Sequence, residues 1–155
     1  LTKATHTPCD VRHSTCYKTD YVTGACMLVR RDVVERIGLM NEEYFLYYED
    51  VDWCTKAKRA GYNCAMVPSS KIWHKVSATN RENSPSYIYY HTRNSLIFAK
   101  LNGNFVQKIA AHMLGAWILL KQGVKFIFAR NKGNWAVPMS RGVLDFYRGV
   151  GGQYH

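Results

Sequence analysis

The sequence has no uninterrupted run of about 18 apolar residues, the length that a membrane-spanning helix requires. No two of its five cysteines have C-x-x-C spacing, and the number is odd, so neither a zinc ribbon nor a complete disulfide framework is predicted. Reduced thiols in a cytoplasmic protein are the simpler interpretation. Internal repeats and low-complexity tracts are also lacking, and 47% hydrophobic residues exclude a chain that is disordered throughout.

Acidic residues are scarce in the second half of the chain. Residues 1–82 contain 12 basic and 10 acidic residues, whereas residues 83–155 contain nine basic residues and one acid, Asp145. The net charge of +10 favours a polyanionic neighbour: nucleic acid, an anionic membrane surface or a phosphorylated ligand. A basic surface that is merely solvated explains the charge equally well.

Hydrophobic periodicity and end signals predict a chain of short strands and longer helices. Residues 1–19 show no sustained period and are expected to be irregular. The expected strands are 25–29 and 62–67, with an extended piece at 71–74, and the expected helices are 33–37, 49–60, 87–101, 105–128 and 142–147.

The expected helix 105–128 is strongly amphipathic, with an excess of apolar residues, and a break near Gly123 is an alternative to one long helix. Such a helix either packs on the rest of the protein or lies in a membrane interface. Its apolar face comprises Phe105, Val106, Ile109, Met113, Trp117, Leu120 and Val124, and the basic residues in and after it are Lys108, Lys121, Lys125, Arg130 and Lys132.

Three carboxylates lie within four residues, in the segment from Tyr47 to Trp53 (YYEDVDW). The partial positive charge of a helix N-terminus keeps carboxylates at that position ionised. An ionised carboxylate in a cleft can remove the proton of an alcohol as a general base. Acids also favour the first turn of any helix, and the pattern alone leaves both interpretations open.

Three further positions carry candidate functional residues. His74 follows Trp73 at the end of an extended piece, where a neutral imidazole can ligate a metal, although a surface or hydrogen-bonded histidine is the alternative. The small residues Thr23-Gly24-Ala25 allow a ligand or another backbone segment to approach closely, or they simply begin a strand. Arg93 and Asn94, on an expected helix, are suited to contact a phosphate or a sugar hydroxyl, or else form a plain helix surface.

Several motifs follow one another in a characteristic order. They are DYVTGA at 20–25, MLVRR at 27–31, GLMNEEYFLYYEDVDW at 38–53, KRAGY at 58–62, VP at 67–68, WHK at 73–75 and YHTRN at 90–94. Over roughly residues 20–100 this series resembles the second half of the family 2 inverting glycosyltransferases. It is similar in particular to the rhamnosyltransferase-like bacterial members that build cell-surface polysaccharides.

The resemblance implies a GT-A fold, an α/β sandwich that binds a nucleotide-diphosphate sugar together with Mn²⁺ or Mg²⁺. It makes Asp50 the catalytic base, supported by Glu49, and His74 a ligand of the metal beside the diphosphate. A single in-line displacement would transfer the sugar, rhamnose being one candidate, with inversion. The residues that it implies for binding the acceptor or the donor sugar are Thr23, Gly24, Ala25, Asp52, Trp53 and Arg93.

The first half of that family, with its nucleotide pocket and D-x-D metal carboxylates, has no counterpart before Thr23. Asp50-Val51-Asp52 has the D-x-D spacing but occupies the position of the base. The chain also begins at Leu1 without a signal peptide, so we expect the C-terminal part of a longer enzyme, inactive as a transferase by itself. Residues 1–104 are expected to form the C-terminal half of the catalytic domain, and residues 105–155 a basic, mainly helical extension.

The expected partners are a nucleotide-diphosphate-sugar donor, a saccharide or polyprenyl-linked acceptor and an anionic membrane surface. The expected location is the cytoplasm, at the inner face of the cytoplasmic membrane. A sheet edge left open by missing strands predicts a dimer or an aggregate. The alternative function is a basic module that binds a membrane surface or nucleic acid without catalysis, but nucleic-acid-binding signatures are lacking, so nucleic acid is not an expected partner.

Overall fold

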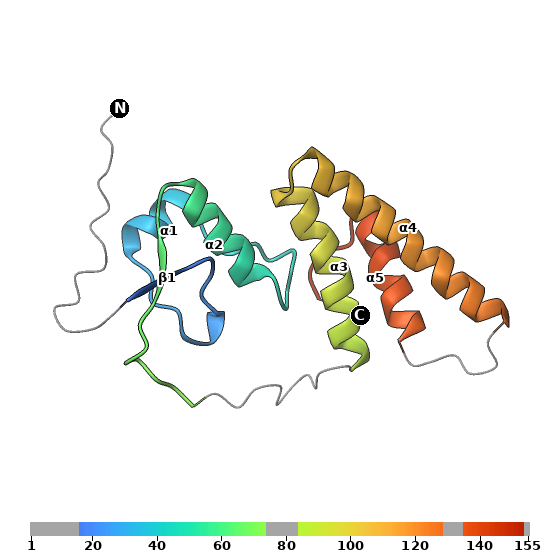
Figure 1. Ribbon diagram of the computed structural model, residues 1–155, viewed down its shortest axis with the longest axis horizontal. Helices are drawn as coiled ribbons and strands as arrows, with labels where there is room; N and C mark the ends of the chain where they lie inside the picture. Colours follow the sequence, from blue (N-terminus) through green and yellow to red (C-terminus); the bar gives the residue numbers. More distant parts are fainter. Residues whose placement is uncertain (1–15, 74–83, 129–134, 154–155) are drawn as a thin grey trace. The chain divides into compact units, whose positions relative to one another are not determined.

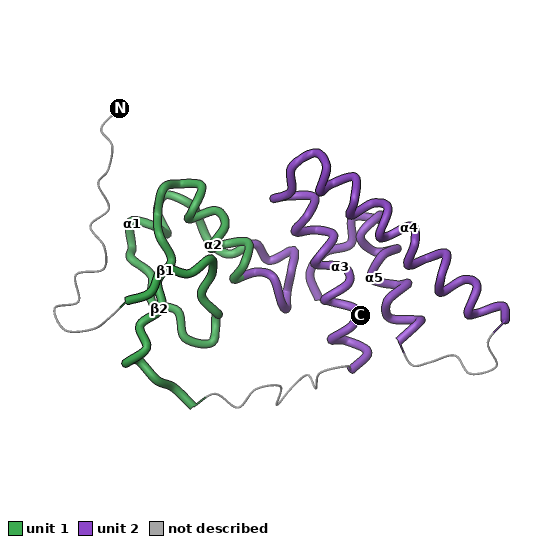
Figure 2. The backbone as a smooth tube through the Cα atoms, in the orientation of Figure 1, with its two compact units in different colours: residues 1–40, 50–75 green, residues 41–49, 76–155 purple. Residues whose placement is uncertain are grey.

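The computed structural model describes residues 16–73, 84–128 and 135–153 (Figure 1). The chain divides into two compact units (Figure 2). Unit 1 comprises residues 1–40 and 50–75, and unit 2 comprises residues 41–49 and 76–155. The predicted boundary between residues 104 and 105 falls inside unit 2. The division into a catalytic part, residues 1–104, and a helical extension, residues 105–155, stays a prediction.

Unit 1 combines a small antiparallel sheet with short helices. Tyr17 lies opposite Met66 and Thr19 opposite Cys64 in a sheet of two strands. The elements are β1 (Tyr17–Thr19), the 3-10 turn η1 (Gly24–Cys26), α1 (Arg31–Ile37), α2 (Glu49–Arg59, whose first residue belongs to unit 2) and β2 (Cys64–Met66).

The ends of the two helices follow local sequence signals. α1 stops at Gly38, where φ is +79°, a conformation that glycine adopts without a steric penalty. α2 starts with Glu49 and Asp50 and has Lys56, Lys58 and Arg59 in its last turn, charges that complement the helix dipole at each end. Both helices were predicted, and both predictions are confirmed.

The packing of unit 1 depends on the buried face of α2. Trp53, Cys54 and Ala57 are buried along it. The Nε1–H group of Trp53 donates a hydrogen bond to the carbonyl oxygen of Gly38 at 2.8 Å, and the backbone N–H of Val22 donates to Sγ of Cys54 at 3.4 Å. These bonds join α2 to the segments before and after α1.

The described residues of unit 2 form the loop 41–48, the first residue of α2 and three helices that pack against one another (Figure 1). Ser84 caps the first of them by accepting a hydrogen bond from the N–H of Tyr87, and Pro85 occupies the first helical position, where a missing N–H is harmless. The helices are α3 (Pro85–Asn102), α4 (Phe105–Phe128) and α5 (Ala136–Arg148).

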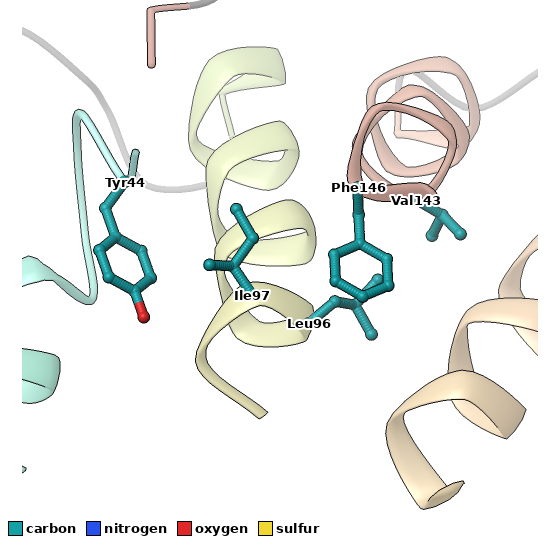
Figure 3. Packing of buried hydrophobic residues seen from close by; sticks show 5 residues of the cluster. All are labelled: Tyr44, Leu96, Ile97, Val143 and Phe146. Carbon is teal, nitrogen blue, oxygen red and sulfur yellow. The ribbon is translucent and has the colours of Figure 1, made fainter. Parts of the chain in front are cut away.

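The core of unit 2 draws on the loop, α3 and α5 (Figure 3). Tyr44 of the loop is fully buried, and Leu96 and Ile97 of α3 lie with Val143 and Phe146 of α5 in the same cluster. Burial of five large apolar side chains removes enough surface from water to hold the loop and both helices together.

Glycines let α5 approach its neighbours closely. A Cβ atom on Gly142 would lie 2.9 Å from the carbonyl oxygen of Tyr89 and 3.2 Å from the backbone nitrogen of Arg93. A Cβ atom on Gly115 of α4 would lie 3.1 Å from Oη of Tyr147. The helices of unit 2 are therefore closer than larger residues at these positions would allow.

The remaining element predictions have mixed outcomes. Helices 87–101 and 105–128 are confirmed as α3 and α4, and α4 continues through Gly123 without a break. The helix expected at 142–147 is longer, since α5 begins at Ala136. Strand 62–67 is reduced to the three residues of β2.

Two expectations for unit 1 are wrong. Residues 25–29 form no strand: Gly24–Cys26 is a 3-10 turn, and the extended backbone from Met27 onward pairs with no strand among the described residues. β1 lies at the end of the segment that was expected to be irregular. Residues 71–73 have no regular structure, and His74 lies outside the described residues.

Candidate active site

The carboxylate of Asp50 is held against the turn that contains Gly24. Its Oδ2 atom accepts a hydrogen bond from the N–H of Gly24 at 3.0 Å, and its Oδ1 atom accepts one from the N–H of Val51 at 2.8 Å. Thr23, Gly24 and Ala25 are exposed, and Asp50 is half-buried. The structure thus brings together two sequence segments that were predicted separately as functional.

The contact between Gly24 and Asp50 leaves room for a methyl group. A Cβ atom at position 24 would lie 3.8 Å from Cβ of Asp50 and 4.0 Å from its Oδ2 atom, which are ordinary van der Waals distances. Each carboxylate oxygen can accept about two hydrogen bonds, and each accepts one from a backbone N–H here. The carboxylate is therefore oriented and still able to accept a proton.

Asp52 and Trp53, by contrast, do not present a surface to a substrate. The side chain of Asp52 is fully buried and forms an ion pair with Lys56 at 2.8 Å, one helical turn further along. Trp53 is only 7% exposed, and its N–H is bonded to Gly38. The structure supports a role for both in holding α2, in place of the predicted sugar contact. Glu49 is half-buried at the first position of the same helix.

Arg93 is also buried, although the sequence predicted that it contacts a substrate. Its Nη2 atom donates to the carbonyl oxygens of Glu43 at 3.1 Å and of Tyr44 at 3.0 Å. Asn94, equally buried, donates from Nδ2 to the carbonyl oxygens of Tyr44, Leu46 and Tyr47. Both side chains are buried and hold the loop, so they form no plain helix surface and are not exposed for contact with a ligand.

That Asn94 holds the loop was not predicted from the sequence, and no neighbouring residue in the sequence indicates this role. The carbonyl groups that it binds precede it by 47 to 50 positions. Backbone carbonyls are present at every residue, so the sequence of the loop does not mark which of them need a side-chain donor.

Rings gather on the loop and on the first turns of α3. The ring of His91 lies 4.5 Å from that of Tyr47 and 4.1 Å from that of Tyr87, centroid to centroid. Burial lowers the pKa of His91 below its ordinary value, since a charged imidazole loses hydration there. Burial likewise raises the pKa of Tyr48. Both groups are therefore favoured in their neutral forms.

A metal site does not follow from the described residues. Among residues 16–73, 84–128 and 135–153, no group of three or more His, Cys, Asp and Glu side chains is arranged to hold a metal ion. The predicted ligand His74 lies outside these residues. His74 as a metal ligand therefore stays a prediction.

A second candidate surface lies on α4. The helix turns Ala111, Gly115, Ile118 and Gln122 toward the rest of unit 2. The opposite side, here called the outer face of α4, is between 44% and 77% exposed. It consists of Phe105, Val106, Ile109, Met113, Trp117, Leu120 and Val124.

The outer face is apolar and slightly hollowed. An open hollow of about 550 Å³ is lined by Met113, Leu114, Ala116, Trp117 and Leu120. Lys121 and Lys125 are exposed on the same helix. Seven large apolar residues of this amphipathic helix thus lie away from the core of unit 2, whereas Ala111, Ile118 and Leu119 pack against it. In the part of the chain that the structure describes, no helix is both long and apolar enough to cross a membrane.

Comparisons with known proteins point in the same direction as the motifs. The family described as "Glycosyltransferase like family 2" matches residues 2–95. The chain is 32% identical over 78 residues to the N-acetylglucosaminyl-diphospho-decaprenol L-rhamnosyltransferase of Mycobacterium tuberculosis, covering 50% of this chain and 25% of that protein. It is 25% identical over 151 residues to the dTDP-rhamnosyl transferase RfbF of Shigella flexneri, covering 91% of this chain and 50% of that protein.

A further relative is the low-salt glycan biosynthesis hexosyltransferase Agl10 of Haloferax volcanii, 26% identical over 108 residues, or 66% of this chain and 35% of that protein. The chain therefore spans a quarter to a half of the length of these three relatives. No solved structure gives a significant match.

Proposed function

Since the chain belongs to the glycosyltransferase-like family 2, we propose that the protein carrying it transfers a sugar from a nucleotide-diphosphate donor to an acceptor hydroxyl. The relatives named as rhamnosyl transferases support rhamnose as the sugar, and the relative named for a decaprenol diphosphate supports a polyprenyl-linked saccharide as the acceptor. A non-catalytic nucleic-acid-binding module is not favoured, because the family match covers the same residues as the motifs.

The observation that carries this proposal is the bond between Gly24 and Asp50. It holds a carboxylate in a defined orientation beside an exposed turn of small residues, as a general base needs. The mixed helix and sheet content of the described residues is compatible with the second half of a GT-A-like domain.

In the proposed reaction, the acceptor hydroxyl oxygen attacks the anomeric carbon of the donor sugar. The new carbon–oxygen bond forms as the bond from that carbon to the diphosphate oxygen breaks, and the leaving nucleoside diphosphate takes the electron pair. A carboxylate oxygen of Asp50 accepts the proton of the hydroxyl. One displacement of this kind inverts the anomeric carbon.

A divalent cation would supply Lewis-acid stabilisation of the departing diphosphate. The described residues do not by themselves fit a complete metal site, so the steps above involve only Asp50 and the substrates. Mn²⁺ or Mg²⁺, with His74 as one ligand, remains part of the proposal through the resemblance. Replacement His74→Ala should lower activity, and added Mn²⁺ should restore it in part.

The test of the base uses the full-length protein that contains this chain. Release of nucleoside diphosphate is measured with a panel of nucleotide sugars, dTDP-rhamnose among them, and lipid extract as acceptor source. Asp50→Asn should lower the rate by about 10²–10⁴-fold, the usual contribution of a general base. The matched control is Asp32→Asn, which changes an exposed acid of α1 that pairs only with the neighbouring Arg30 among the ion pairs of the described residues. Full activity of the Asp50→Asn variant would mean that the acids only cap the helix.

A matched pair of variants at Gly24 tests the hydrogen bond itself. Gly24→Pro replaces the N–H that orients Asp50 by a ring carbon, which displaces the carboxylate from its place 3.0 Å from the nitrogen. Proline suits the first position of a helical turn after the extended Thr23, whose ψ is 139°. Gly24→Ala keeps the N–H and adds only a methyl group. The proline variant should be much less active than the alanine variant; equal activities would show that the bond does not matter for turnover.

The outer face of α4 supports a membrane-surface role for the same protein, and we propose an anionic bilayer as its occupant. The argument is charge complementarity: exposed Lys121 and Lys125 accompany an apolar face, and residues 83–155 hold nine basic residues against one acid. The proposal puts the enzyme at the inner face of the cytoplasmic membrane, where a polyprenyl-linked acceptor would be found.

Sedimentation of the full-length protein with lipid vesicles tests this surface. Binding to vesicles rich in phosphatidylglycerol should exceed binding to neutral vesicles and should weaken at high salt. Lys121→Glu with Lys125→Glu should reduce it, whereas Lys71→Glu, an exposed lysine of unit 1, should change it little. If vesicles are not bound and light scattering shows a dimer that Trp117→Glu dissociates, the occupant is a second copy and the membrane proposal fails.

A further inference from the structure

The loop that precedes Glu49 has an unusual backbone. Phe45, Tyr47 and Tyr48 have φ values of +62°, +64° and +75°. Bulky residues rarely adopt this left-handed region, because the Cβ atom approaches the following carbonyl group. Such conformations persist only where the surroundings impose them, and they concentrate at functional sites.

Asn94 supplies most of what imposes this shape. Its Nδ2 atom lies 2.9 Å from the carbonyl oxygen of Tyr44, 2.6 Å from that of Leu46 and 3.0 Å from that of Tyr47. One amide group thus gathers three carbonyls of the strained loop. The side chain of Asn94 is fully buried, so solvent cannot replace it.

Arg93 holds the start of the same loop and is itself held on several sides. Its Nε atom donates to Oδ1 of Asn94 at 3.0 Å, and its guanidinium carbon lies 5.2 Å from the ring centres of both Tyr89 and Tyr90. Its Nη1 atom donates to Oη of Tyr89 at 3.2 Å, and that hydroxyl donates to Asp145 at 2.9 Å. The buried charge of Arg93 is thus compensated through α5.

The C-terminal segment adds a further anchor. The N–H of Gly152 donates to the carbonyl oxygen of Glu43 at 2.8 Å, the same oxygen that accepts from Arg93. A Cβ atom on Gly151 would lie 2.6 Å from Cγ of Glu43, so glycine is needed for this approach. The loop is therefore held from α3 and from the segment after α5.

We propose that Arg93 and Asn94 are positioning residues for sugar transfer. Both are fully buried, so neither touches a substrate; they act by holding residues 43–48 in one strained shape, and Glu49 and Asp50 follow directly in the chain. The inference rests on the proposed function of Asp50 as the base. Without the pair, the loop relaxes toward ordinary φ values, and α2, which continues the loop at Glu49 and Asp50, no longer starts from one fixed backbone conformation.

The experiment compares the rate constants of variants in the full-length protein. Asn94→Asp keeps the size of the side chain and the acceptor for Arg93 but replaces the donor that faces the three carbonyls. It should lower kcat on the order of 100-fold, the effect of a misplacement of about 1 Å, with little change in KM for the donor. The matched control is Asn104→Asp, where the side chain acts as an acceptor for the N–H of Gln107 and an aspartate serves equally well.

A second variant separates positioning from mere stability. Glycine adopts a positive φ at no steric cost, so Phe45→Gly in the Asn94→Asp background should recover part of the lost kcat. Arg93→Lys keeps the positive charge but loses the several N–H donors of the guanidinium group, and it should lower kcat less than Asn94→Asp does. It is the variant to measure if Asn94→Asp fails to fold.

The outcomes distinguish this inference from the function on which it rests. The positioning role is refuted, and Asp50 remains the base, if Asp50→Asn is inactive while Asn94→Asp has the kcat of the unaltered protein. Arg93→Lys replaces Asn94→Asp in this comparison if Asn94→Asp does not fold. If Asp50→Asn is fully active, the proposed function itself fails. A lower melting temperature of Asn94→Asp with unchanged kcat would also make the pair merely structural.

Discussion

Gly142 offers a sharp test of how α3 and α5 fit together, because a single methyl group is enough to disturb the contact. The Cβ atom of an alanine there would lie 2.9 Å from the carbonyl oxygen of Tyr89, 3.2 Å from the backbone nitrogen of Arg93 and 3.2 Å from Cβ of Thr92. Two of these three atoms belong to the backbone of α3, which cannot move aside as a flexible side chain can. Gly142→Ala therefore has to push the two helices apart.

The expected magnitude follows from two opposing contributions. Replacing a helical glycine by alanine favours the helix by about 1 kcal/mol. Forcing an extra carbon into a close contact costs about 1–3 kcal/mol, and separating α3 from α5 also loosens the buried cluster around Val143. We expect a net loss in the free energy of unfolding of unit 2 of about 1–2 kcal/mol.

Gly123 provides the matched control within the same unit. It lies inside α4, and a Cβ atom there would meet no atom within 4 Å. Gly123→Ala should therefore stabilise the helix by up to about 1 kcal/mol, since only the intrinsic preference of alanine acts.

Urea unfolding followed by far-ultraviolet circular dichroism measures the difference, because the three longest helices all belong to unit 2. With a denaturant slope of about 1–3 kcal/mol per molar urea, the two variants should differ in midpoint by roughly 1 M. If Gly142→Ala proves as stable as Gly123→Ala, the close approach of α3 and α5 is not a real constraint and the reasoning fails.

Three smaller predictions concern single side chains. Because burial lowers the pKa of His91 in the folded protein, unit 2 should lose stability as the pH falls below about 6.5, where the unfolded chain begins to bind a proton at this residue. Thermal melts across pH should show a smaller loss for the His91→Gln variant, and an equal loss would contradict the role of His91. Trp53→Phe removes the donor to the carbonyl of Gly38 and should cost about 1–3 kcal/mol in chemical unfolding, and an unchanged midpoint would contradict the importance of this bond. Ser84→Ala removes the N-cap of α3 and should cost about 1 kcal/mol, with Ser84→Asp as the variant that retains capping.

The helices were largely predictable because their signals are local. α2 and α3 were both predicted from periodicity and end signals, which lie within each helix or directly beside it. The strand expected at 25–29 failed for the opposite reason. An apolar run after a glycine is compatible with a strand only if another strand lies beside it, and the sequence of the run does not contain that information.

The candidate site was predicted in part. The sequence identified Asp50 and the Thr23-Gly24-Ala25 turn separately, and the structure joins them through one hydrogen bond. The sequence also identified Arg93, but it predicted a contact with the substrate. In the structure Arg93 is completely buried and contacts the loop instead. A buried arginine and an exposed one look the same in a linear pattern.

The sequence by itself determined the family, through the order of its motifs, and the positions of most helices, through charges, caps and periodicity at neighbouring positions. Tertiary structure decided which residues are available to a ligand. Asp52, Trp53 and Arg93 are enclosed, whereas the outer face of α4 is open because the helix packs on unit 2 through its opposite side. The physical reason is that burial depends on segments far apart in the chain, such as Asn94 and the carbonyl of Tyr44, 50 positions earlier, whereas helix signals act within a turn or two.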